Sequence, residues 1–206
     1  MNTMNTTHFW SWFTANEYKL RSLHNLYDNE RTELLFWLSQ HLKYYSLQIG
    51  HRLIIPQEGK EPSTLSFSIC GDPEVRGLIL KLMSEAPQYE NWIISASLKS
   101  LANEDQDYFE KEYCLEGICC RPSNIKFWGE VAEVNTKQFI LGIVLNFPIT
   151  HIEPIILKAI VAIILTDTLG ESLYHRHIKG FNIHTQIPED EDLFELYELK
   201  LYLEEL

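Results

Sequence analysis

Apolar residues in the first 45 positions recur with the period of an α-helix. Phe9, Phe13 and Leu20 share one face of a helix that starts after Thr6 or Thr7, either of which can cap it. A second helix is predicted to end at residue 45, and four side chains form its apolar stripe: Leu34, Leu38, Leu42 and Tyr45. The chain therefore opens with two predicted helices.

From residue 47 the apolar period changes to two, which is typical of strands. Residues 47–55 and 64–70 are predicted to pair as a hairpin, the second strand being half buried. Asp72 and Pro73 then supply the cap and first residue of a helix that stops before Pro87. With a further strand following from Trp92, the pattern predicts a strand–strand–helix–strand unit.

The same order of elements recurs in the second half of the chain. Residues 99–123 are acidic and predict a linker or a short exposed helix. Two strands are predicted over 125–134 and 139–145. A buried helix follows, capped by Thr150 with Glu153, and ended by Gly170. The last predicted strand covers the stretch from Tyr174 to His184.

The C-terminal stretch 188–206 holds eight acidic residues and enough apolar ones for a docked helix. The apolar residues are Leu193, Leu196, Tyr197, Leu199 and Leu203. We predict an α+β fold with a mostly antiparallel sheet built from two strand–strand–helix–strand units, helices on one face, and two N-terminal helices. Residues 1–206 are expected to form a single domain with pseudo-equivalent halves of about 1–100 and 101–206.

Composition narrows the choice of partners. The formal charge is −12, with 29 acidic against 17 basic side chains. Such a surface repels the phosphates of nucleic acids and anionic membranes, so neither is an expected partner. A basic protein would be attracted. An acidic surface of this kind can also serve solubility alone.

The expected location is the cytoplasm. The first seven residues lack the basic-then-apolar order of a secretory signal. The most apolar stretch, 152–165, is interrupted by Pro154 and Lys158 and is too short to span a bilayer. All four cysteines are therefore expected to be reduced and to behave as small buried hydrophobes.

Histidines suggest one metal site. In a strand, His175 and His177 would point to the same side and could reach one ion. Only Asp167 and Glu171, from nearby turns, are candidates for a third ligand. The alternative is a pair of surface histidines that bind nothing.

Other chemical signatures are weak. Cys114, Cys119 and Cys120 lack zinc-knuckle spacing, which favours a structural role. The carboxylate pair Glu130 and Glu133 is of a kind that any acidic protein contains by chance. The sequence has no phosphate-binding glycine loop or nucleophile elbow, and no cofactor is predicted.

The aromatic run near the N-terminus is dense for one helix. Trp10, Trp12 and Phe13 cannot all share a face with Phe9, so some must meet a second surface. That surface is the sheet or a partner protein, since aromatic residues are enriched at binding hot spots. Core packing is the favoured interpretation.

Three short segments carry a family resemblance: the opening Phe-Trp-Ser-Trp-Phe run with Asn16-Glu17, the stretch Glu90-Asn91-Trp92, and Leu169-Gly170-Glu171. They resemble a family of uncharacterised bacterial cytosolic proteins, a domain of unknown function. The resemblance covers most of the chain and implies an α+β fold and a bacterial source. It implies no activity and no catalytic residues.

Three functions are consistent with these features. The first is a non-catalytic intracellular protein-binding module, for example one that neutralises a basic protein such as a toxin. The alternative is a metal-dependent enzyme or small-ligand binder that uses His175 and His177. The third is a homo-oligomer formed through edge strands or aromatic side chains.

Overall fold

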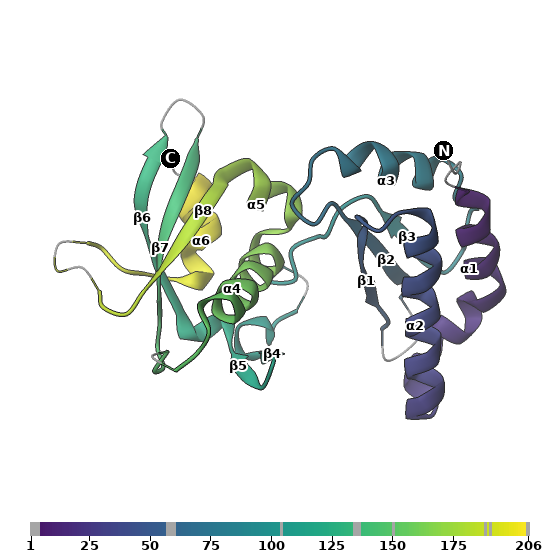
Figure 1. The fold of residues 1–206 in the computed structure, drawn as a ribbon, viewed down its shortest axis with the longest axis horizontal. Helices are drawn as coiled ribbons and strands as arrows, with labels where there is room; N and C mark the ends of the chain where they lie inside the picture. Colours follow the sequence, from purple (N-terminus) through teal and green to yellow (C-terminus); the bar gives the residue numbers. More distant parts are fainter. Residues whose placement is uncertain are drawn as a thin grey trace. The chain divides into compact units, whose positions relative to one another are not determined.

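The chain folds into two compact units, Met1–Leu98 and Lys99–Leu206, each with its own sheet and hydrophobic core (Figure 1). The structure is a computed structural model. It describes residues 5–56, 61–103, 105–133, 137–149, 151–187, 189 and 191–204, with the backbone alone at 131–133. The predicted α+β class is confirmed, but the strands of the described residues form three separate sheets instead of the one sheet predicted. That the two units form one domain stays a prediction.

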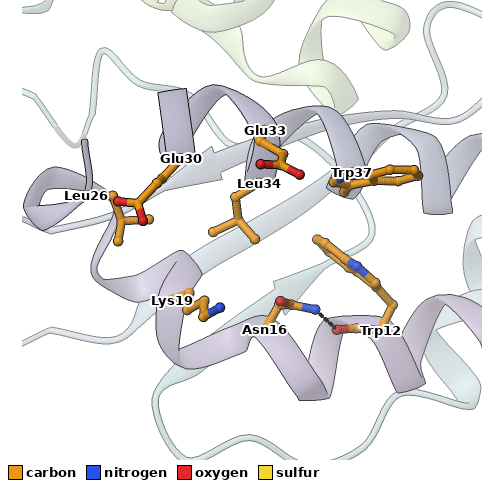
Figure 2. Close-up of a pocket in the computed structure, with 8 residues that line it drawn as sticks. All are labelled: Trp12, Asn16, Lys19, Leu26, Glu30, Glu33, Leu34 and Trp37. Carbon is orange, nitrogen blue, oxygen red and sulfur yellow. Dashed lines mark hydrogen bonds between the residues drawn. The ribbon is translucent and has the colours of Figure 1, made fainter. Parts of the chain in front are cut away.

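The N-terminal unit begins with the two predicted helices, α1 (Thr6–Arg21) and α2 (Asp28–Tyr45). The 3-10 turn η1 (Leu23–Asn25) lies between them, and the two helices run side by side (Figure 2). The predicted stripes of both helices are confirmed, because every one of their residues is buried in a core shared with the sheet: Phe9, Phe13, Leu20, Leu34, Leu38, Leu42 and Tyr45.

A three-stranded sheet lies against these helices. β1 pairs antiparallel with β2, which confirms the predicted hairpin, and β2 pairs parallel with β3 after a crossover through α3. The elements are β1 (Gly50–Ile54), β2 (Ser63–Ser68), α3 (Val75–Ser84) and β3 (Trp92–Ser95). As the central strand, β2 is covered on both faces. Ser66 and Ser68 are therefore buried along with Leu65 and Phe67, and the half-buried prediction is wrong.

The C-terminal unit contains a four-stranded mixed sheet in the order β8-β7-β6-β9. β6 pairs antiparallel with β7 and β9, whereas β7 pairs parallel with β8. The strands are β6 (Ile125–Glu133), β7 (Gln138–Leu145), β8 (Ile178–His184) and β9 (Phe194–Glu195). In both units the second hairpin strand is central and pairs in parallel with the strand that follows the helix.

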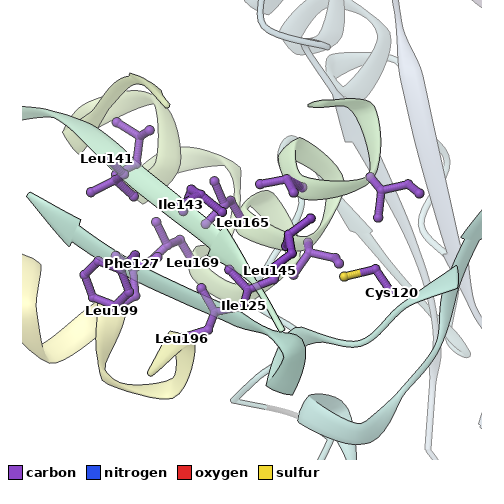
Figure 3. Packing of buried hydrophobic residues seen from close by; sticks show 14 of the residues in the cluster. Cys120, Ile125, Phe127, Leu141, Ile143, Leu145, Leu165, Leu169, Leu196 and Leu199 are labelled. Carbon is purple, nitrogen blue, oxygen red and sulfur yellow. The ribbon is translucent and has the colours of Figure 1, made fainter. Parts of the chain in front are cut away.

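One face of this sheet packs against helix α4 (Pro154–Leu169). Figure 3 shows Phe127, Leu141 and Ile143 of the strands meeting Leu165 and Leu169 of the helix. The C-terminal stretch docks on the same core through three buried leucines: Leu196, Leu199 and Leu203. The docked helix is therefore confirmed, although it is short, comprising η4 (Leu196–Glu198) and α6 (Leu199–Glu204).

The ends of α4 partly match the prediction. Glu153 is the N-cap and Pro154 the first helical residue, whereas Thr150 lies outside the described residues. Gly170 ends the helix as predicted, with a positive φ of 78° that suits glycine. A further helix, α5 (Glu171–His177), then occupies the start of the predicted last strand. None of the helices within the described ranges is both long and apolar enough to cross a membrane.

The acidic stretch after Lys99 is neither a linker nor an exposed helix, so that prediction is wrong. Tyr108 is fully buried, and its hydroxyl donates to the Ile164 carbonyl at 2.9 Å. The stretch contains two 3-10 turns and a small hairpin: η2 (Tyr108–Glu110), β4 (Tyr113–Leu115), β5 (Ile118–Cys120) and η3 (Pro122–Asn124). Its apolar side chains pack on the core, whereas Asp107, Glu110 and Glu112 are exposed. The acidic composition therefore gave no sign of the packed side.

Candidate functional site

The outward sides of α1 and α2 line an open cavity of about 280 Å³, which we call the α1–α2 groove. Most of its helical residues lie three or four positions apart, so each helix contributes one face, and Leu26 joins them from the turn before α2. The lining comprises Trp12, Asn16, Lys19, Leu26, Glu30, Glu33, Leu34 and Trp37. The groove therefore arises directly from the pairing of the two N-terminal helices.

Two indole rings, those of Trp12 and Trp37, lie at one end of the groove (Figure 2). The indole of Trp12 stacks on the His41 imidazole, with ring centroids 4.9 Å apart and an interplanar angle of 20°. The same imidazole lies 6.1 Å from Trp37. Trp37 keeps 39% of its surface exposed. His41 thus packs against both indoles, and part of the Trp37 surface stays open to a ligand.

Charged groups border the rest of the groove. Glu30 and Glu33 project from the N-terminal part of α2, and Lys19 projects from α1 (Figure 2). The backbone N–H of Tyr27 donates to Glu30 Oε2 at 3.3 Å, which holds this carboxylate at the helix start. With two carboxylates and one ammonium, the lining carries a net negative charge. Leu26 and Leu34 supply the apolar floor.

This arrangement suits a ligand with an apolar stem and a cationic head. A guanidinium or ammonium group is attracted to the face of an indole by the ring quadrupole. Its charge can also pair with a carboxylate in a strong hydrogen bond. The methylene stem of Lys or Arg packs well on leucine side chains. All three elements are present within one groove.

His41 is a half-buried residue of α2 beside the groove. Its Nδ1 atom is buried without a hydrogen-bond partner in the described structure. Burial, and secondly the nearby His8 imidazole at a ring distance of 4.9 Å, lower the pKa of His41 below its usual value. His41 is therefore disposed to be neutral, which suits its stacking against Trp12.

The structure divides the predicted partner-binding residues. Trp10 and Phe13 are buried in the core, and the Trp10 indole donates to the Leu82 carbonyl at 2.8 Å. These two side chains are not accessible to a partner, which corrects their assignment as partner-binding residues and agrees with the favoured interpretation of core packing. Trp12 lies in the groove. Sequence reasoning missed Trp37, although its place outside the stripe of α2, beside the exposed Phe36, was a usable signal.

The geometry assumed for the histidine metal site is wrong. His175 and His177 lie in α5 and not in a strand, so residues two apart point to different sides. The His177 Nδ1 atom lies 3.1 Å from the Lys137 carbonyl oxygen, and the His175 ring packs on Tyr174. The proposed third ligand Asp167 is buried and accepts from the Tyr113 hydroxyl at 2.9 Å.

Three of the four cysteines differ from the expectation that all are reduced and buried, because Cys70, Cys114 and Cys119 are exposed. Cys114 and Cys119 form a disulfide, so the expectation that all four are reduced is wrong for this pair. Cys70 is free and exposed, whereas Cys120 is free and buried, and burial raises its pKa to about 11. Among the described residues, one group of three possible metal-binding side chains has its ligand atoms within 4.8 Å of one another. It consists of Glu112 and the two bonded cysteines.

A second cavity of about 280 Å³ lies beside β6 and β7. Its charged group is Lys126, which is already paired with Glu195 at 2.6 Å. Nearby in the same sheet, Glu130 accepts from the Asn182 amide at 2.8 Å and lies 3.5 Å from His184 Nε2. Lys126 and Glu130 thus already have partners within the sheet, whereas His184 Nε2 is buried without a hydrogen-bond partner in the described structure. Because this cavity offers no unpaired charged group among its described lining residues, the α1–α2 groove is the stronger candidate.

Comparison of the chain with models of protein families, with curated proteins and with solved structures finds no match. The resemblance to a bacterial family therefore stays a prediction, and function is argued from the groove itself.

Proposed function

We propose that the protein is a non-catalytic intracellular protein-binding module whose α1–α2 groove holds a Lys or Arg side chain of a basic partner. The observation that carries this proposal is the open pair of indoles, Trp12 and Trp37, bordered by the carboxylates of Glu30 and Glu33. A basic toxin that the protein neutralises belongs to this partner class.

Two further features support the proposal. The formal charge of −12 attracts a basic protein and raises the rate of encounter. Binding hot spots are enriched in tryptophan, and they commonly combine a rigid aromatic anchor with a ring of weaker contacts. In the groove, stacking on His41 gives Trp12 that rigidity.

The alternative function, a metal-dependent enzyme or ligand binder centred on His175 and His177, receives no such support. It depended on two imidazoles pointing to one side of a strand. In α5 the two side chains diverge, and each already contacts a neighbour, Lys137 or Tyr174.

The first prediction concerns affinity. A short peptide with one Arg flanked by Leu residues is titrated into the protein by calorimetry. A second peptide carries Glu in place of Arg. We expect the Arg peptide to bind and the Glu peptide not to bind. Replacing Trp12 or Trp37 by Ala should weaken binding about tenfold, the loss typical of an aromatic anchor. Glu33→Gln should weaken it less and reduce its dependence on salt.

Two variants serve as matched controls. Tyr18→Ala removes an exposed aromatic residue of α1 outside the groove, and Glu90→Gln removes an exposed carboxylate of the same unit. Neither should change the affinity. If the groove variants bind as tightly as the controls, the peptide is held by the general negative charge, and the proposal fails.

A further inference from the structure

The hairpin β4–β5 presents its two faces to different surroundings. Its turn is Glu116-Gly117, and both residues have positive φ, 50° and 79°, as a two-residue hairpin turn of this type requires. Cys114 and Cys119 are directly paired across the strands, with Cα atoms 4.1 Å apart, and both are exposed. Residues on the other face pack on the core of the C-terminal unit: Tyr113, Leu115, Ile118 and Cys120.

A purely structural role accounts poorly for a disulfide at this place. A disulfide stabilises a fold chiefly by restricting the unfolded chain, and the effect is smallest for short loops. Cys114 and Cys119 enclose only four residues. The turn residues already set the register of the strands. Tyr113 also anchors the hairpin, since its hydroxyl donates to Asp167 Oδ2 at 2.9 Å.

We propose that Cys114 and Cys119 form a reversible dithiol–disulfide site that exchanges with thiol reductants in solution. In the cytoplasmic location predicted from the sequence, disulfides are typically transient and serve redox sensing or catalysis. The site is separate from the α1–α2 groove and does not depend on the proposed binding function.

The exchange follows ordinary thiol chemistry. A thiolate of a dithiol reductant attacks one Sγ atom, forms a mixed disulfide and releases the other cysteine as a thiolate. The second thiol of the reductant then displaces the remaining cysteine. The Sγ–Sγ bond is broken, two electrons and two protons pass to the cysteine pair, and the reductant leaves as its own disulfide. Oxidation runs through the same steps in reverse.

The hairpin is built to keep the two thiols together after reduction. The Cys120 side chain lies in the hydrophobic core (Figure 3), and its raised pKa of about 11 keeps it protonated and unreactive. On the exposed face, Arg121 and Glu112 form an ion pair at 2.7 Å across the strands. The ion pair lies at the open end of the hairpin and the Glu116-Gly117 turn closes the other end, so the reduced pair stays in register and can close again.

The test is a redox titration of the folded full-length protein. The protein is equilibrated in graded ratios of reduced to oxidised dithiothreitol, quenched with acid, alkylated and analysed by peptide mass spectrometry. We expect Cys114 and Cys119 to gain and lose the label together in one two-electron transition, with circular dichroism unchanged. The variant Cys70→Ser, which removes the other exposed cysteine, should give the same transition.

Three outcomes would overturn the proposal. The first is labelling of Cys114 and Cys119 only after denaturant unfolds the protein, which would make the disulfide purely structural. The second is labelling of both residues even in fully oxidising buffer, which would mean that the pair does not close. The third is a transition that changes in Cys70→Ser, which would place Cys70 in the exchange.

Discussion

His41 stands where the aromatic side chains of α1 and α2 meet. Its ring contacts Trp12 and His8 at 4.9 Å, Tyr44 at 5.7 Å and Trp37 at 6.1 Å. An imidazolium at this place would sit beside a second histidine and lose hydration. Protonation of His41 in acid should therefore disturb the packing of the two indoles.

A pH prediction follows from this environment. Burial and His8 lower the pKa of His41, and burial and Lys43 lower that of His51. The unfolded chain, with ordinary histidine pKa values near 6.5, therefore takes up more protons as the pH falls. The stability that these two neutral histidines contribute is fully present above about pH 7 and declines as the pH drops through about 6.5.

The measurement is thermal unfolding between about pH 8 and about pH 5.5. We expect the melting temperature to fall on the acid side, and the fall to be smaller in His41→Gln and His51→Gln. The exposed His24 gives the matched control, because His24→Gln should leave the acid-side fall unchanged. An acid-side fall of equal size in all variants would show that these two imidazoles are not its source.

Among the single elements, α4 is the clearest case in which the sequence pattern predicted a helix but not the side that faces the sheet. Its sequence is apolar on nearly every side, so periodicity could not say which residues face the sheet. The structure buries Ile164 completely and leaves Ile163 46% exposed. Neighbouring isoleucines in one helix thus occupy opposite environments.

The difference in burial predicts that mutation of Ile164 lowers stability more than mutation of Ile163, which serves as the control. Ile164→Ala should lower the free energy of unfolding by about 2–5 kcal/mol, because it removes buried methylene groups and leaves a cavity. Ile163→Ala should change it by less than about 1 kcal/mol. Urea denaturation followed by circular dichroism measures both. Equal losses would mean that α4 does not pack on the sheet through the side described.

The elements that the sequence predicted well are those whose pattern is strong and local. The stripe of Leu34, Leu38 and Leu42 has unambiguous helical spacing, and the alternation around Leu65 identifies a strand. The hairpin β4–β5 was not predicted, because its strands have three residues each and acidic residues flank them in the sequence. Helix α5 was not predicted, because His175-Arg176-His177 shows no helical spacing of apolar residues.

The candidate site was less accessible from sequence than the fold. Trp12 stood out because the aromatic run exceeds what one helix face can hold. The groove, however, depends on how α1 and α2 pair, and Glu30 and Glu33 look like ordinary solvated residues along α2. Likewise, the pairing of Cys114 with Cys119 depends on a hairpin register that spacing alone does not specify.

In the molecule as a whole, most of the negative charge belongs to one unit and the groove belongs to the other. Residues 99–206 contain 19 acidic and nine basic side chains, a formal charge of −10, whereas residues 1–98 contain ten and eight, a charge of −2. The C-terminal unit would therefore supply most of the attraction for the proposed basic partner. The N-terminal unit supplies the groove that would anchor one side chain of it.

We propose that the groove binds a cationic side chain through Trp12 and Trp37. The most direct measurement follows the five indole N–H signals by NMR while the Arg peptide is added. Signals of Trp12 and Trp37 should shift in a saturable way. Those of Trp10 and Trp92, whose N–H groups donate to the Leu82 carbonyl and Glu17, should stay, as should that of buried Trp128. Unmoved Trp12 and Trp37 signals, or equal shifts with the Glu peptide, would show that the groove does not bind a cationic side chain.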